Sequence, residues 1–272
     1  MKWVKRIVVG LLAVAAVAYV AVLGVMYVMQ RDFQYDRSGR MLALSETNLS
    51  GAELVSIPTD DGTPLGGWYQ APQPGMPAIL FFRGNSQSFS REHKRYEAFV
   101  AEGYGFLAFD YRGFPGSPGE VTEAHVLANA LAAYEWLAAK GAPIVLWGRS
   151  LGSGPATYVA SLKDTDALLL ETPFYSAVEV AADRYGFLPV GLLMHDQYRV
   201  DQWMLSVDEP VLVAHGTADS TIGVKHGERV HALAKHPDEL WIVDGVDHGG
   251  LWDAGIWDHA KAFFERVESA KP

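Results

Sequence analysis

The chain has 272 residues, of which 49% are hydrophobic and 20% charged, and its formal net charge is -10. This composition is typical of a folded domain, and so acidic a chain lacks the basic surface that binds nucleic acid. The sequence contains no cysteine, which excludes disulfides, thiol nucleophiles and cysteine-based metal sites.

The first element is a long apolar segment. Residues 7–29 contain no charged side chain. As a helix they would span about 35 Å, which is enough to cross the core of a bilayer. A cleaved signal peptide is the alternative, but its apolar region is only about 7–15 residues long. We therefore expect residues 1–30 to be an uncleaved membrane anchor, followed by a linker over residues 31–50.

Basic residues flank this segment on both sides, and they are Lys2, Lys5 and Arg6 before it and Arg31, Arg37 and Arg40 after it. Basic residues closest to a span favour the cytoplasmic side of the membrane. We therefore expect a single-pass protein with a cytoplasmic N-terminus. The rest of the chain would then lie outside the cytoplasm, in a periplasm or a lumen.

From about residue 50, predicted strands alternate with predicted helices. Short apolar runs predict eight strands, at residues 53–58, 65–70, 78–82, 106–110, 144–147, 167–170, 211–214 and 240–243. Apolar residues at three- and four-residue spacing predict helices at residues 91–102, 123–139, 152–162, 224–234 and 254–267. The alternation predicts an α/β domain over residues 51–272. We expect a mostly parallel sheet with helices on both faces and an antiparallel edge formed by the first two strands.

One segment interrupts the alternation. Residues 174–205 are apolar and aromatic but contain no predicted strand, and we interpret them as a small lid inserted after the sixth strand. An apolar pocket would be lined by eight of its side chains, namely Phe174, Tyr175, Phe187, Leu188, Val190, Leu192, Leu193 and Met194. Simple packing of the lid on the core is the alternative for each of them.

The segment Gly148-Arg149-Ser150-Leu151-Gly152 fits the pattern G-x-S-x-G, directly after an apolar strand and before a helix of small residues. In this context the serine occupies a sharp turn, and the glycines make room for it. The helix N-terminus then directs backbone N–H groups toward developing negative charge. Ser150 is therefore the predicted nucleophile, and an ordinary glycine-rich turn is the alternative.

A serine hydroxyl needs a base to react at neutral pH. His248 follows the last predicted strand in a loop with glycines, which is where α/β folds place their ligands. His215, after the seventh strand, is interpreted as a buried residue that supports its loop. Four other histidines lie in or beside predicted helices and are expected at the surface: His226, His231, His236 and His259.

The predicted acid is Asp219, in the loop after the seventh strand, where it would orient His248 and stabilise its protonated form. The chain order Ser150, Asp219, His248 is the one expected for such a site. The alternatives are other acidic residues near strand ends, namely Glu171, Asp244 and Asp247.

An oxyanion hole would complete this site. One donor is expected from the backbone N–H of Leu151, and the second from that of Asn85 or Ser86, in the loop after the third strand. Such a donor lowers the reaction barrier by about 3 kcal/mol. The sequence contains no metal-binding or nucleotide-binding motif, so we predict neither a metal nor a cofactor.

Over residues 50–270 the chain resembles the α/β-hydrolases, in particular the membrane-anchored Bem-type and serine-aminopeptidase-like branch. Four stretches carry the resemblance: residues 110–117 (Asp-Tyr-Arg-Gly-Phe-Pro-Gly-Ser), the Ser150 turn, the lid from residue 171 to 194, and residues 215–219. The resemblance implies an α/β-hydrolase fold and esterase, lipase or thioesterase chemistry on acyl substrates. It assigns Ser150, Asp219 and His248 the roles given above.

The chain departs from the family pattern at two positions. Arg83-Gly84-Asn85 stands where the family usually has His-Gly-Asn, and a glycine follows His248 where the family usually has asparagine. The usual histidine supports its loop and does not react, so the three predicted catalytic residues are unaffected.

We expect a membrane-tethered serine hydrolase that acts on lipid-like or other apolar esters through an acyl-enzyme. The same residues also suit a peptidase or amidase, acyl transfer or perhydrolysis. A catalytically degenerate, membrane-anchored binding protein is the alternative from another class, and Arg83 is its only support.

Overall fold

An eight-stranded sheet forms the centre of the molecule in the computed structural model, which describes residues 1–270. Its order is β1-β2-β4-β3-β5-β6-β7-β8. The strands are β1 (Glu53–Ile57), β2 (Leu65–Gln70), β3 (Ala78–Phe82), β4 (Gly105–Phe109), β5 (Ile144–Arg149), β6 (Ala167–Glu171), β7 (Pro210–Gly216) and β8 (His236–Val243). Strand β2 pairs antiparallel with β1 and β4, and all other neighbours pair parallel. The predicted mostly parallel sheet with an antiparallel edge is confirmed.

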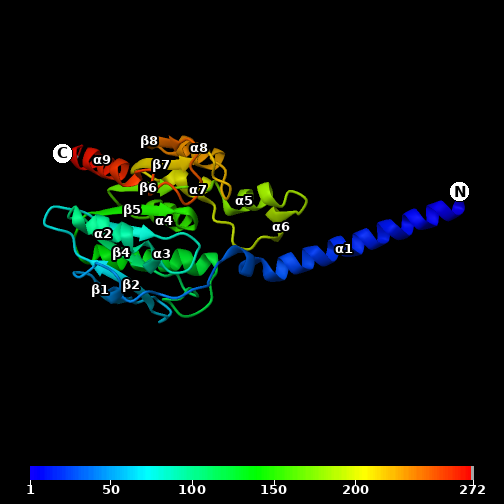
Figure 1. Cartoon of the computed structure of the whole chain (residues 1–272), viewed down its shortest axis with the longest axis horizontal. Helices are drawn as coiled ribbons and strands as arrows, with labels where there is room; N and C mark the ends of the chain where they lie inside the picture. Colours follow the sequence, from blue (N-terminus) through cyan, green and yellow to red (C-terminus); the bar gives the residue numbers. More distant parts are fainter. Residues whose placement is uncertain (271–272) are drawn as a thin grey trace.

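Helices cover both faces of the sheet (Figure 1). One buried cluster joins the sheet to α3 (Glu123–Ala138), α4 (Ser153–Ala160) and α8 (Lys225–Leu233). A second cluster, on the other face, joins it to α2 (His93–Ala101) and α9 (Ile256–Ser269). Because the central strands are covered on both sides, β3, β4 and β6 are buried along their whole length.

The edge strand β8 differs from its prediction. It begins at His236, whereas the apolar run predicts a start at residue 240. Its first three residues, His236, Pro237 and Asp238, are exposed. An edge strand needs no continuous apolar run, because one side of it faces water, so the pattern missed its first half.

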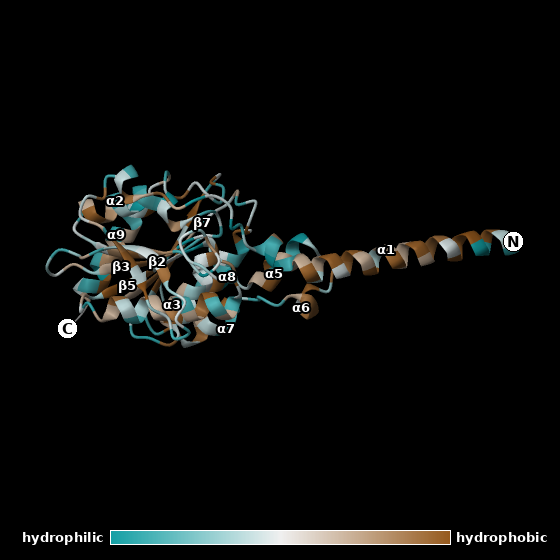
Figure 2. Ribbon diagram, turned by 90° about the horizontal axis from the view of Figure 1, so that it is seen from below, coloured by the Kyte–Doolittle hydropathy of each residue, from teal (hydrophilic) through white to brown (hydrophobic). Residues whose placement is uncertain are grey.

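The N-terminal helix α1 (Lys2–Gln34) has no buried residue and is long and apolar enough to cross a membrane. It continues into the first residues of the predicted linker. Figure 1 shows its N-terminal half projecting away from the α/β domain, and Figure 2 shows mostly hydrophobic turns along this half, with hydrophilic residues near the N-terminus.

The predicted lid contains helices and no strand. It consists of α5 (Ala177–Arg184), α6 (Val190–Leu193) and α7 (Val200–Trp203), followed by a short 3-10 helix at Met204–Ser206. Both α5 and α6 lie beside the C-terminal half of α1, so a segment from the start of the chain reaches the carboxyl end of the sheet (Figure 1).

Candidate active site

Ser150 lies in a strained turn between β5 and α4. It is the first residue of a short 3-10 helix, Ser150–Gly152, and its φ is 51°, in the left-handed region that non-glycine residues rarely adopt. A Cβ on Gly152 would lie 2.0 Å from the carbonyl oxygen of Phe82, and one on Gly148 would lie 2.7 Å from the Cβ of Ala156. The two glycines are therefore required for the turn that presents Ser150 at the carboxyl end of the sheet.

Three side chains from separate loops meet at this turn. The Nε2 atom of His248 lies 2.9 Å from Oγ of Ser150, and its Nδ1 atom lies 2.8 Å from Oδ2 of Asp219. Ser150 follows β5, Asp219 follows β7 and His248 follows β8. Because these three strands are parallel, the three side chains lie together at the carboxyl end of the sheet. The structure thus brings together the predicted nucleophile, acid and base.

The carboxylate of Asp219 is buried and fully engaged. Its Oδ2 also lies 3.1 Å from Nε2 of His215, and its Oδ1 accepts from the backbone N–H groups of Thr221 and Ile222 at 2.9 and 2.8 Å. Burial acts to raise the pKa of Asp219, but the hydrogen bonds from His215 and His248 outweigh it and leave this pKa below its ordinary value. An ionised acceptor is therefore available to His248 at neutral pH.

His215 has the supporting place that the sequence predicts. Its side chain is completely buried, and Nε2 lies 2.8 Å from the carbonyl oxygen of Ile222 as well as near Asp219. It ties both ends of the Asp219 loop together.

The alternative acids occupy other networks. Glu171 accepts two hydrogen bonds from Arg95, both of 2.8 Å, and others from Trp147 and Arg149 at 3.0 and 3.3 Å. Asp244 accepts from the hydroxyl of Thr217, and Asp247 accepts from backbone N–H groups. Within residues 1–270, none of the three bonds to the imidazole of His248.

Glu171 instead has a structural place beneath the serine turn. Its side chain is completely buried, and it neutralises Arg95, which is nearly as buried, and Arg149, the residue before Ser150. Replacing Glu171 with alanine is expected to cost about 3–5 kcal/mol of unfolding free energy, because Arg95 and Arg149 lose the more deeply buried of the two carboxylates that they share, the other being Glu92.

Urea denaturation measures this cost. Asp244→Ala is the matched control, since Asp244 is an exposed carboxylate whose loss is expected to change stability by about 0.5 kcal/mol or less. If Glu171→Ala does not fold, the isosteric Glu171→Gln allows the same comparison. Equal stability of the Glu171 variant and the control would contradict this assignment.

Arg83, the departure from the family pattern, is also buried. Its Nε lies 3.3 Å from Oδ1 of Asp110, its Nη2 donates to the carbonyl oxygen of Ser86 at 2.6 Å, and its guanidinium lies 4.4 Å from the ring centroid of Phe114. Arg83 thereby holds the loop that contains the predicted oxyanion donors.

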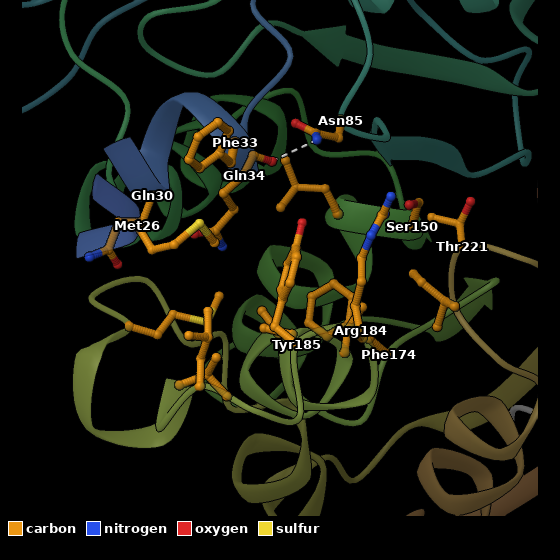
Figure 3. Close-up of a pocket in the computed structure, with 18 of the residues that line it drawn as sticks. Met26, Gln30, Phe33, Gln34, Asn85, Ser150, Phe174, Arg184, Tyr185 and Thr221 are labelled. Carbon is orange, nitrogen blue, oxygen red and sulfur yellow. Dashed lines mark hydrogen bonds between the residues drawn. The ribbon is translucent and has the colours of Figure 1, made fainter. Parts of the chain in front are cut away.

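A cavity of about 410 Å³ opens beside Ser150 and His248 (Figure 3). Asn85, Ser86 and Leu151, the predicted oxyanion residues, all line it. The side chain of Asn85 is engaged elsewhere, since its Nδ2 donates to the carbonyl oxygen of Gln34 at 2.7 Å, drawn as a dashed line in Figure 3. The loop that contains the predicted oxyanion donors Asn85 and Ser86 is therefore tied to the end of α1.

The lid lines the cavity, but only some of the side chains predicted from the sequence take part. Five of the eight predicted side chains do so: Phe174, Leu188, Val190, Leu193 and Met194. The prediction is wrong for Phe187 and Leu192, which are 65% and 88% exposed, and for Tyr175, whose ring packs against Arg229. Apolar character alone does not tell whether a side chain of a short lid helix points inward or outward.

Part of the pocket lining comes from residues that were not predicted from the sequence. Residues of α1 line it, namely Met26, Tyr27, Gln30, Phe33 and Gln34. The one available signal was the glutamine pair Gln30 and Gln34, four residues apart on one helix face at the end of an apolar segment. Arg184, an exposed cation of α5, also lines the pocket, and Figure 3 shows it beside Tyr185 on the lid side.

The expected surface position is wrong for His226. This histidine is 1% exposed, and it accepts from the backbone N–H of Tyr175 at 3.3 Å while its Nε2 lies 3.0 Å from Asp183. It lies on the face of α8 that meets the lid, which a helix pattern cannot show.

Within residues 1–270, no group of three or more histidine, aspartate or glutamate side chains is arranged to hold a metal ion.

No protein-family model matches the chain. It is 36% identical over 243 residues to Rv2307c of Mycobacterium tuberculosis, covering 86% of each chain. It is 30% identical over 196 residues to the lysophosphatidylserine lipase ABHD12 of Danio rerio, covering 64% of this chain and 51% of that one. The esterase Pf2001 of Pyrococcus furiosus has a similar fold, with a TM-score of 0.66 at 19% identity over 86% of this chain and 96% of that one.

Proposed function

The chain belongs to the α/β-hydrolase superfamily, and we propose that it is a serine hydrolase that cleaves carboxylic esters with apolar acyl groups. The observation that carries the proposal is the hydrogen-bonded chain Ser150–His248–Asp219 at the wall of a largely apolar cavity. We further propose that α1 anchors the protein in a membrane, with its N-terminus in the cytoplasm and the catalytic domain on the other side.

In the proposed reaction, His248 Nε2 takes the hydroxyl proton of Ser150 as Oγ attacks the ester carbonyl carbon. Buried Asp219 holds the imidazole in place and stabilises its protonated form. The N–H of Leu151, with that of Asn85 or Ser86, would bind the developing oxyanion.

The rest of the reaction restores the enzyme. His248 returns the proton to the leaving alkoxide, so that the C–O bond breaks, an alcohol departs and the acyl group stays on Ser150. A water molecule then attacks the acyl carbon while His248 takes its proton. The carboxylic acid is released when His248 gives that proton back to Oγ of Ser150.

The cavity supports a lipid-like substrate. Apolar side chains from α1 and the lid surround it, among them Met26, Leu188 and Leu193, which suits an acyl chain. The lipase relative from zebrafish, by its name, acts on a lysophospholipid. The guanidinium of Arg184, on the lid side of the cavity, would favour an anionic group on the alcohol portion of the ester.

Labelling with a fluorophosphonate, which reacts with activated serines, tests the proposal. We expect wild-type protein to be labelled and Ser150→Ala to be unlabelled. Ser161→Ala is the matched control that keeps the label, because Ser161 lies at the end of α4 and its hydroxyl donates to the carbonyl oxygen of Tyr158. A folded wild-type protein that takes no label would contradict the proposal.

A panel of soluble esters then tests the substrate class. We expect kcat/KM to rise with acyl length, by up to about fourfold for each methylene that the cavity buries. A flat or falling profile would argue for a polar substrate instead.

A further inference from the structure

The lid and the second half of α1 are docked side by side. The hydroxyl of Tyr19 donates to the carbonyl oxygen of Phe187 at 2.9 Å. The amide of Gln30 donates to the carbonyl oxygen of Leu193 at 3.1 Å and accepts from the N–H of His195 at 2.7 Å. Figures 1 and 2 both show α6 beside this part of α1, whereas the N-terminal half of α1 projects alone. The lid thus contacts α1 from Tyr19 onward.

The undocked part of α1 is too short to cross a bilayer. Residues 7–18 are uncharged and span about 18 Å as a helix, whereas the hydrocarbon core is about 30 Å thick. A core that begins at Ile7 takes about 20 residues and ends near Met26. If α1 spans the membrane, Tyr19 lies about 10 Å inside that second boundary. The lid residues bonded to Tyr19 must lie at the same depth.

The lid has the composition that this depth requires. Residues 185–194, here called the lid tip, contain no charged side chain. Phe187 and Leu192 of the lid tip point outward and are 65% and 88% exposed. Exposed apolar side chains on an uncharged segment are typical of surfaces that enter a membrane interface by about 5–10 Å.

The uncharged parts of the two segments end at the same level. Gln30 of α1 bonds to His195, and Arg31 pairs with Asp196 at 2.9 Å, so the first charged residue after the apolar part of α1 meets the first one after the lid tip. This pair would lie in the polar zone at the membrane surface, with the lid tip and Tyr19 on its apolar side.

Several polar groups of the lid tip form hydrogen bonds within the protein. The backbone N–H groups of Leu188, Val190, Leu192 and Met194 all donate to carbonyl oxygens of the lid. The pairing of Tyr19 with the carbonyl oxygen of Phe187 satisfies the one hydroxyl near the middle of the apolar part of α1. In hydrocarbon an unpaired group of either kind would be costly, so this bonding fits immersion.

We propose that the lid tip is immersed in the leaflet that faces the α/β domain, so that the bilayer itself is the partner of this surface. The pocket of Ser150 then opens at the membrane boundary, because Met26 and Leu193 line it, and an acyl chain passes from the leaflet into the cavity without crossing water. The inference rests on the proposed membrane span of α1, and it does not depend on the ester chemistry.

Single cysteines test the proposal, since the natural chain has none and each can be labelled uniquely. Leu192→Cys, Val22→Cys in α1 and Leu54→Cys in β1 all replace exposed apolar side chains, so the fold is expected to tolerate them. Each full-length variant carries a nitrobenzoxadiazole label and is reconstituted into phosphatidylcholine vesicles. Fluorescence is measured with doxyl-labelled phospholipid in the bilayer, and separately with iodide on both sides.

We expect the Leu192 label to behave like the Val22 label, losing most of its fluorescence to doxyl phospholipid and none to iodide, with the opposite result at Leu54. A Leu192 label that iodide quenches while Val22 is protected would overturn the immersed lid tip alone. Iodide quenching at Val22 would overturn the membrane span as well. Neither readout depends on hydrolysis, so a failure of the ester proposal is recognised separately, by the fluorophosphonate experiment.

Discussion

Replacing Ser150 with alanine is expected to lower kcat on a soluble aryl ester by about 10⁶-fold, and replacing His248 is expected to cost about as much. The two side chains act as one unit, because the hydroxyl reacts only as its proton passes to the imidazole 2.9 Å away. The double variant is therefore expected to lose no more than either single variant.

Steady-state rates of the three variants at saturating ester, measured on folded protein, give this comparison. The residual rate of each is expected to exceed the uncatalysed one by about 10³–10⁴-fold, from substrate binding and the oxyanion donors. A double variant far slower than both single variants would mean that Ser150 and His248 act independently, which contradicts the proposed reaction.

The second large effect is expected at Asp219. Asp219→Asn keeps the size of the side chain but should lower kcat by about 10⁴-fold, because an amide neither fixes the reactive tautomer of His248 nor stabilises its charged form. The carboxylate lies 2.8 Å from Nδ1 of His248, whereas Glu171 is bound to arginines. Glu171→Gln is therefore expected to affect stability more than kcat.

The kcat values of Asp219→Asn and of the exposed control Asp244→Asn measure the effect. An equal loss in both variants, or a larger loss in Glu171→Gln that persists in folded protein, would move the acid role away from Asp219.

The pH dependence of wild-type activity is expected to show no titration of Asp219 near neutral pH. Its pKa in the folded protein lies below the ordinary value, so the stability that it contributes is present above the unfolded pKa and is lost as pH falls through the folded one. Between pH 5 and 8, about the range of greatest stability for most proteins, Asp219 stays ionised. Loss of activity in that range would therefore arise from another group.

Sequence patterns alone do not distinguish Glu171 from Asp219 as the acid that bonds to His248. Both residues stand at the carboxyl ends of neighbouring strands, β6 and β7, and both are buried. Position in the sequence favours Asp219, in the loop after β7, as the catalytic acid. The partner of each carboxylate, however, is set by residues far away in the chain. Arg95 of α2 binds Glu171, and His248 reaches Asp219 only because β8 pairs with β7.

Local patterns in the sequence were enough to predict the alternation of strands and helices, the glycine-flanked turn at Ser150 and the uncharged run of α1. Each of these features depends on residue type and short spacing. Long-range packing, by contrast, sets the outward orientation of Phe187 and Leu192, the burial of His226, and the place of α1 as a wall of the pocket. These features depend on which face of a helix meets a segment distant in the chain. The contact between Tyr19 and Phe187, 168 residues apart, is of this kind, and neither residue's neighbours in the sequence predict it.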